Sequence, residues 1–153
     1  MFSQGYSHFS SLFIDSLDDQ PALAYRIPIS TPTNERLALS VKFPPSSLNA
    51  ALRGAELADD GFVGVVDAAG TFIARNTRNE QVSHAVGRPS SDALLLSALS
   101  QRDEVIASTT DDGETVILAT SYSPQTGWLL GLGLPTRAAM RSSGPGRPPR
   151  PGP

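Results

Sequence analysis

Apolar and polar residues alternate along several short stretches of the chain, a period typical of half-buried β-strands. The apolar positions of residues 21–29 (PALAYRIPI) share one face: Leu23, Tyr25, Ile27 and Ile29. Those of residues 36–43 (RLALSVKF) do the same: Leu37, Leu39, Val41 and Phe43. Turn-forming residues (STPTNE) lie between the two stretches, so the pattern predicts a β-hairpin.

A second hairpin is predicted in residues 61–76, GFVGVVDAAGTFIARN. Two apolar stretches flank the turn that starts at Asp67, and Gly70 supplies the positive φ that such a turn requires. The second strand ends on a cation, Arg75.

Three further strands form a predicted meander over residues 104–110, 115–123 and 128–135, with Asp-Gly and Thr-Gly turns between them. One face of the middle strand carries Val116, Leu118, Thr120 and Tyr122, and one face of the last carries Trp128, Leu130, Leu132 and Leu134. Gly131 and Gly133 leave the other face of the last strand bare. Another element or a ligand is therefore expected to approach its backbone closely.

Two helices complete the expected elements. Residues 44–57 predict a short helix capped by Ser46 or Ser47, and residues 90–100 predict a helix capped by Ser90 or Ser91. A short strand over 11–15 is also expected, and 76–89 has the pattern of a loop. The order predicts an α+β fold with a central antiparallel sheet of five to six strands and short helices on one face.

Length and composition set the domain organisation. The chain of 153 residues is 39% hydrophobic, enough for one core. Residues 1–10 are expected to be a flexible lead-in, 11–136 the folded domain and 137–153 a disordered tail rich in Pro, Gly and Arg.

Charge and cysteine content exclude several classes of function. The net charge is −3, but the tail holds four arginines and no acid, which leaves residues 1–136 at about −7. An acidic body argues against nucleic-acid binding, which needs a cationic surface. There is no cysteine, so disulfides and thiolate catalysis are excluded. No apolar run is long enough to span a membrane, and no signal peptide is evident.

No set of residues with the pattern of a catalytic or metal site stands out. His84 has no neighbour at metal-ligand spacing, and the Ser-Ser-Asp sequence at Ser90 lacks a histidine base at a meaningful distance. An enzyme is therefore not expected, and neither is a metal. A small cytosolic enzyme is one hypothesis for the function. It would need a cluster of titratable groups in one cleft, and the sequence does not display such a cluster.

An ordered series of short motifs resembles the PAS-like sensor module of the Cache superfamily over roughly residues 10–135. It consists of Asp67, Gly70, Ala74-Arg75, Val86-Gly87, Asp112-Gly113, Gly127-Trp128 and Pro135. Such modules are extracytoplasmic input domains of bacterial histidine kinases, diguanylate cyclases and chemoreceptors. The resemblance implies a domain that senses a small molecule on the periplasmic side of the inner membrane, without a cofactor and without catalysis.

The chain departs from that family at both ends. Family members begin with a transmembrane helix and a long helix that leads into the sheet, and they return to the membrane after the last strand. Here neither helix is present, and no transmitter domain follows. The chain is therefore expected to be a detached or truncated piece of a membrane receptor, which as written could remain cytoplasmic.

Four residues are candidates for ligand binding. Arg75 offers a guanidinium fork that matches a carboxylate, so an anionic ligand is favoured. Thr120 and Tyr122 share a strand face and are expected to line the same cavity, with Arg88 at the start of the second helix.

Each candidate also has a structural interpretation. Arg75 would hold its hairpin closed by binding loop carbonyls or Asp67, and the others would pack in the core or brace the loop. The alternative is accordingly that the chain is a structural or dimerisation remnant of a receptor, which binds no ligand. Its partner would then be a second copy in a homodimer.

Overall fold

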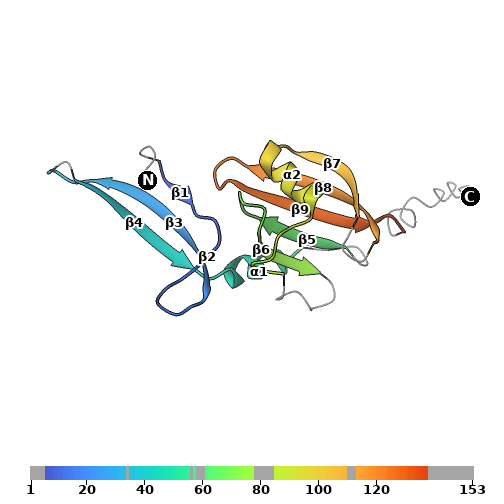
Figure 1. The fold of residues 1–153 in the computed structure, drawn as a ribbon, viewed down its shortest axis with the longest axis horizontal. Coiled ribbons are helices and arrows are strands. Elements are labelled where there is room, and N and C mark those ends of the chain that lie inside the picture. Colours follow the sequence, from blue (N-terminus) through green and yellow to red (C-terminus); the bar gives the residue numbers. More distant parts are fainter. Residues whose placement is uncertain are drawn as a thin grey trace, which may run out of the picture.

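The computed structural model describes residues 6–33, 35–55, 57, 61–77, 85–109 and 113–137, and it contains two antiparallel sheets (Figure 1). The five-stranded sheet has the order β6-β5-β9-β8-β7. Its strands are β5 (Phe62–Val66), β6 (Phe72–Thr77), β7 (Glu104–Thr109), β8 (Thr115–Ser123) and β9 (Trp128–Pro135). This sheet confirms the second hairpin, the meander and the α+β class predicted from the pattern.

The second sheet is four-stranded and forms the N-terminal part of the fold. It consists of β1 (His8–Phe9), β2 (Phe13–Ile14), β3 (Pro21–Ser30) and β4 (Arg36–Phe43). β3 pairs with each of the other three strands. The β3–β4 hairpin confirms the first predicted hairpin, whereas β1 forms within the segment expected to be a lead-in.

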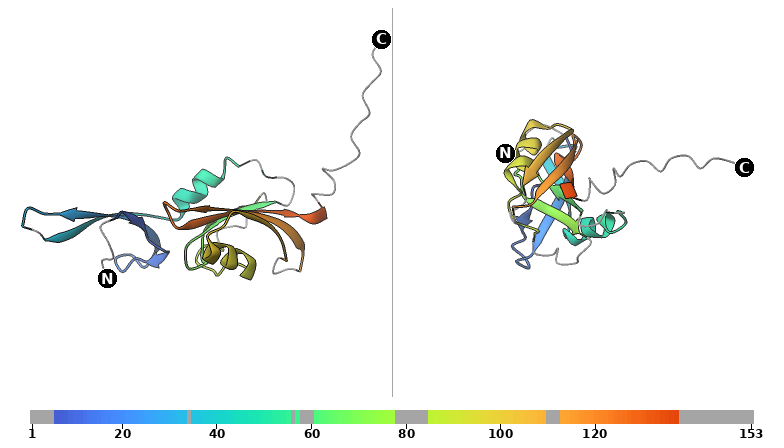
Figure 2. Two further views of the ribbon diagram at one scale, coloured as in Figure 1. Left: turned by 90° about the horizontal axis from the view of Figure 1, so that it is seen from above. Right: turned by 90° about the vertical axis from the view of Figure 1, so that its right-hand side faces the viewer.

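The two helices lie on opposite faces of the five-stranded sheet (Figure 2), not on one face as expected. α1 (Ser46–Leu52) places Leu48 against a cluster of Leu23, Ile73 and Trp128. α2 (Asp92–Ser100) places Leu94 in the other cluster, whose further members are Val66, Phe72, Leu118 and Leu129. Alternation along β5 explains the division, because Val65 packs with the first cluster and Val66 belongs to the second.

The close approach expected at the bare face of β9 is present. A Cβ added to Gly131 would lie 2.7 Å from a methyl group of Leu94, and one added to Gly133 would lie 2.1 Å from the ring of Phe62. Both glycines therefore allow side chains of α2 and β5 to lie directly on the β9 backbone. The neighbours there are protein side chains.

Turns and helix ends agree with the sequence in part. Gly70 and Gly127 have φ values of 76° and 72°, as their turns require. The first helix, however, is not capped by Ser46 or Ser47. Pro45 holds the N-cap position in a helical conformation without a side-chain cap, since the fixed φ of proline already suits a helix start. The second helix is capped as expected, because Leu94 N–H donates to Ser91 Oγ at 3.5 Å.

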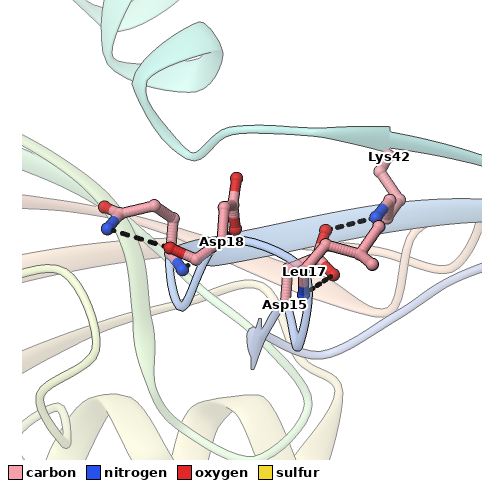
Figure 3. Close-up of polar contacts among 5 residues, drawn as sticks. Asp15, Leu17, Asp18 and Lys42 are labelled. Carbon is pink, nitrogen blue, oxygen red and sulfur yellow. Dashed lines mark hydrogen bonds and ion pairs between the residues drawn. The ribbon is translucent and has the colours of Figure 1, made fainter.

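The turn between β2 and β3 is held by side chains (Figure 3). Asp15 accepts a hydrogen bond from the Lys42 ammonium group on β4 and another from the backbone N–H of Leu17 at 3.2 Å. These two bonds, that of Lys42 first, lower the pKa of the Asp15 carboxyl below its ordinary value. The contact fastens the turn to the neighbouring hairpin. Among the described residues, no helix is long and apolar enough to cross a membrane.

Candidate functional site

A cavity of about 60 Å³ lies on the α2 side of the five-stranded sheet. The described residues of its lining are a mixture of apolar side chains, hydroxyls and a cation. The lining residues are Phe62, Phe72, Arg75, Pro89, Ser91, Leu94, Ser108, Thr109, Val116 and Leu118. The cavity therefore joins the β5–β6 hairpin, the start of α2 and the ends of β7 and β8 that lie next to each other.

Arg75 is the charged residue among the described residues of this lining, and local structure holds it there. Its strand partner is Gly64, which adds no side chain beneath the guanidinium. The guanidinium carbon lies 4.8 Å from the ring centroid of Phe62 and 5.4 Å from that of Phe72. Cation–π attraction to the two rings contributes to the position of the guanidinium at the cavity wall.

The backbone behind Arg75 is tied to the opposite side of the sheet. Its N–H donates to Asn49 Oδ1 on α1 at 3.1 Å. The neighbouring Asn76 donates its side-chain amide to the carbonyl oxygen of Leu52 at 3.0 Å. These two hydrogen bonds link the end of β6 directly to α1.

Three hydroxyls of the described residues also line the cavity: those of Ser91, Ser108 and Thr109. Ser91 comes from the cap of α2, and the other two come from the end of β7. Hydroxyls donate and accept hydrogen bonds, and a guanidinium only donates. The arrangement is chemically suited to a small group with negative charge, and the aromatic and aliphatic side chains provide an apolar floor.

The volume limits what can enter. An apolar cavity of about 150 Å³ accommodates benzene, which has six non-hydrogen atoms, and typical small-molecule pockets measure about 300–1,000 Å³. A space of about 60 Å³ is the size of two or three such atoms. It is thus large enough for a head group such as a carboxylate and too small, in this conformation, for a complete amino acid.

The other predicted site residues are not in the lining of this cavity. Thr120 is buried, and its Oγ1 lies within hydrogen-bond distance of Arg102 O and of the backbone N and O of Glu104. Tyr122 packs against the cluster that contains Leu118, and Arg88 is exposed. The structure brings Arg75 to the cavity and leaves the other three outside it.

The hydrogen bonds around Asp67 and Arg88 bear on the purely structural roles that the sequence also allowed for Arg75 and Arg88. Asp67 accepts the backbone N–H groups of Ala69 and Thr71 through Oδ1, and that of Leu12 through Oδ2. The carboxylate of Asp67 therefore accepts hydrogen bonds from its own turn and from the N-terminal segment, and it is not the partner of Arg75 that the sequence suggested. The interpretation of Arg88 as a brace has a backbone counterpart, because Phe72 N–H donates to its carbonyl oxygen at 2.9 Å. Residues 78–84, part of the loop expected over 76–89, lie outside the described residues.

Sequence reasoning missed Phe62, Phe72 and Ser108 as lining residues. A signal for Phe62 existed, since the hairpin register places it on the strand face of Gly64, the partner of Arg75. Nothing in the sequence pairs Ser108 with that hairpin.

In the described ranges, no group of three or more His, Cys, Asp and Glu residues is placed to hold a metal, and His84 lies outside them.

The fold is similar to that of several solved extracellular or periplasmic domains of receptors. The periplasmic sensory domain of the Campylobacter jejuni chemoreceptor Tlp1 is similar, with a TM-score of 0.71 and 14% identity over 94% of this chain and 54% of that one. The extracellular domain of rpHK1S-Z16, described as a histidine kinase, is similar with a TM-score of 0.72 and 10% identity. The match covers 90% of this chain and 57% of that one. The ligand-binding domain of the Pseudomonas fluorescens chemoreceptor CtaA, in complex with L-isoleucine, is similar with a TM-score of 0.62 and 18% identity. The match covers 92% of this chain and 56% of that one.

No family model matches the sequence, and no curated protein matches it either. The chain spans a little over half the length of the three solved domains. At these identities the likeness is one of fold. It agrees with the PAS-like architecture that the motifs around Asp67 and Arg75 resemble, and the solved domains themselves are sensory or ligand-binding domains of receptors.

Proposed function

We propose that this chain is a ligand-sensing module whose ligand carries a carboxylate or a similarly small anionic group. The observation that carries the proposal is the position of Arg75 at a cavity the size of such a group, beside three hydroxyls. A guanidinium recognises a carboxylate through paired donors, and partial burial strengthens that interaction. The rest of the ligand would extend out of the cavity.

The route from the cavity to the rest of the fold supports a sensing role. Arg75 and Asn76 are bonded to α1 on the opposite face of the sheet, so a ligand that draws the guanidinium toward itself pulls on these bonds. Such a pull changes the output only if the ligand binds one conformation more tightly than the other. α1 is the element through which occupancy would be reported.

The setting of the module is part of the same proposal. The chain matches about half of each solved domain, which are extracellular or periplasmic parts of receptors. We infer that it is one portion of a larger extracytoplasmic sensor, and that membrane helices and a transmitter domain belong to that larger receptor. No catalytic activity is proposed for the chain itself.

A second candidate function is a structural or dimerisation module without a ligand. The cavity is small, and the rings of Phe62 and Phe72 already give the Arg75 guanidinium a favourable position. In that case Arg75 fixes the hairpin, and its replacement lowers stability without altering the binding of any small molecule.

Isothermal titration separates the two candidates. The unmodified protein is titrated with acetate, propionate, glycine, L-asparagine and L-isoleucine, and with methylammonium as a cationic control. The proposal predicts saturable binding of at least one carboxylate and none of methylammonium. Arg75→Gln should weaken that binding by about tenfold or more, since a hydrogen bond to a charged group contributes about 1.5–3 kcal/mol.

Arg53→Gln is the matched control, because Arg53 is an exposed arginine that does not line the cavity. It should leave the affinity unchanged. Arg88→Gln tests the remaining prediction from the sequence, that Arg88 also contacts the ligand. Absence of binding by every carboxylate, or equal affinity of the Arg75→Gln protein, would contradict the sensing proposal and favour the structural module.

A further inference from the structure

Three glycines meet at the centre of the five-stranded sheet. Gly64 on β5 pairs directly with Gly131 on β9, and Gly133 follows two positions later on β9. Residues directly opposite each other in an antiparallel pair share a face, and so do residues two apart in a strand. We call the strip of backbone left without side chains by Gly64, Gly131 and Gly133 the glycine trough. Because Gly64 is also the partner of Arg75, the trough lies on the sheet face that α2 covers (Figure 2).

One side chain fills the glycine trough over each glycine: Phe72, Leu94 and Phe62. A Cβ added to Gly131, for example, would lie 2.7 Å from a methyl group of Leu94. The same three side chains line the Arg75 cavity. Each of them is therefore a wall between the cavity and the bare backbone, and the cavity would be deeper if one of them were shorter.

Leu94 differs from the other two walls in what else it contacts. The rings of Phe62 and Phe72 lie 4.8 Å and 5.4 Å from the guanidinium carbon of Arg75, so both also position the cation. Leu94 comes from α2 and is 3% exposed in the apolar cluster that contains Leu118. A shorter side chain at Leu94 therefore deepens the cavity and leaves both rings beside the cation.

Hydrogen bonds on both sides of Leu94 hold it over the trough. Its own N–H donates to Ser91 Oγ at 3.5 Å. Nearly one turn further along α2, Ser97 is fully buried and donates its hydroxyl to the Glu104 carboxylate on β7. The wall that Leu94 forms is thus fixed to the sheet, and a longer ligand cannot displace it without breaking these bonds.

We propose that Leu94 is the residue that limits the size of the ligand at the Arg75 site. The inference rests on the proposed function, that the cavity binds a carboxylate. With Leu94 in place, the cavity of about 60 Å³ admits the carboxylate group and excludes an alkyl chain from the sheet. Without the branched end of Leu94, such a chain has room to lie along the glycine trough toward Thr120, the partner of Gly131 on β8.

Isothermal titration with acetate and butyrate tests the proposal. In the unmodified protein the two additional methylene groups of butyrate stay outside the cavity, so the two affinities should be similar. In Leu94→Ala these groups enter the trough, and each should raise the affinity by about fourfold. The ratio of butyrate affinity to acetate affinity should therefore rise by about tenfold.

Leu129→Ala is the matched control. Leu129 belongs to the same apolar cluster and is fully buried, but it is not among the residues that line the cavity. Its truncation removes the same atoms from the same core and should leave the ratio unchanged. Leu94→Val retains more of the packing, so it serves if Leu94→Ala does not fold, and it should shift the ratio in the same direction by a smaller factor.

The trough can also be filled from the sheet. The backbone of Gly131 is outside the left-handed region, so alanine suits it. The new methyl group would press Leu94 toward the cavity, and Gly131→Ala should weaken acetate binding. In the double variant Gly131→Ala/Leu94→Ala the methyl group occupies part of the vacated space, so the ratio should fall back toward that of the unmodified protein.

The outcomes separate this proposal from the proposed function. Acetate binding that Arg75→Gln weakens supports the function, whatever the ratio in the Leu94 variants. A ratio that is unchanged in Leu94→Ala, or that rises as much in Leu129→Ala, would overturn the role of Leu94 and leave carboxylate binding in place. Absence of binding of either carboxylate by the unmodified protein would overturn both.

Discussion

Asp67 Oδ2 accepts the backbone N–H of Leu12 at 2.9 Å, although 55 positions separate the two residues in sequence. The other carboxylate oxygen accepts the N–H groups of Ala69 and Thr71 in its own turn. Only 1% of Asp67 is exposed. One buried carboxylate thus joins the N-terminal segment to the turn between β5 and β6, the hairpin that carries Arg75.

Asp67→Asn should destabilise the fold by about 1–3 kcal/mol, because an amide places an NH₂ group where a second acceptor is needed. Chemical denaturation followed by circular dichroism measures the free energy of unfolding. Asp18→Asn is the control, since Asp18 is exposed and accepts one local bond from Gln20. Equal effects of the two substitutions would mean that the Leu12 contact contributes little.

Gly133→Ala should destabilise the protein through the ring of Phe62. The new Cβ would lie 2.1 Å from that ring, so the ring must move, at a cost of about 1–3 kcal/mol. Because Phe62 lines the cavity and contacts Arg75, the same change should also weaken carboxylate binding. Thermal and chemical unfolding together with titration measure both effects.

Two variants control for the loss of glycine itself. Gly54→Ala has space for the added methyl group, with its nearest contact at 3.9 Å, and should change stability by about 0.5 kcal/mol or less. The double variant Gly133→Ala/Phe62→Leu removes most of the ring and should recover part of the lost stability. Failure of that recovery would locate the defect in the β9 backbone.

Phe9→Ala should loosen the N-terminal sheet from the five-stranded one. The ring centroid of Phe9 lies 4.7 Å from that of Tyr25 on β3 and 4.9 Å from that of Trp128 on β9. Its loss is expected to cost about 2–3 kcal/mol, less than for a fully buried ring. A fall in tryptophan emission on denaturant titration reports the loss of packing at Trp128. Tyr6→Ala, at a residue that is 77% exposed, should have no comparable effect.

Lys42→Met should raise the pKa of Asp15 toward its ordinary value, because the Lys42 hydrogen bond is the largest cause of its lowering. A lowered pKa in the folded state means that the contact stabilises the fold above the pKa of the unfolded carboxyl. That stabilisation is lost as the pH falls through the folded value. The stability difference between the variant and the unmodified protein should therefore shrink in acid.

Carboxyl chemical shifts followed by NMR as a function of pH measure the Asp15 titration directly. Lys42→Arg retains the charge and should retain most of the shift. The bond from Leu17 N–H remains in the Met variant, so a residual lowering is expected. An unchanged Asp15 titration in that variant would show that Lys42 does not determine the pKa.

Alternation of apolar residues was sufficient to predict the strands that build both hairpins and the meander. It did not predict burial in the first hairpin, because the apolar residues of β4 from Leu37 to Val41 are exposed. The placement of the helices was not predictable from pattern, because which face each helix covers depends on tertiary packing of Leu48 and Leu94. The prediction that Ser46 or Ser47 caps α1 was wrong, because Pro45 is itself suited to a helix start and holds the N-cap position.

The candidate site was predictable at one residue. Arg75 follows from its place in the hairpin, and the register of that hairpin also implies Phe62. Thr120 shares the expected strand face, but its hydroxyl lies against the backbone of Glu104 on the next strand. A hydrogen bond between strands depends on their register, which the alternation of one strand does not specify.

The central place of β9 has a consequence for how the protein is made. Within the five-stranded sheet, the β5–β6 and β7–β8 hairpins are joined through β9, which pairs with β5 and with β8 and is the last of the described strands. During synthesis the larger sheet therefore stays divided until Pro135 has left the ribosome. A nascent chain stopped before Trp128 would hold two hairpins with unpaired edges, and would be more prone to aggregate than the finished protein.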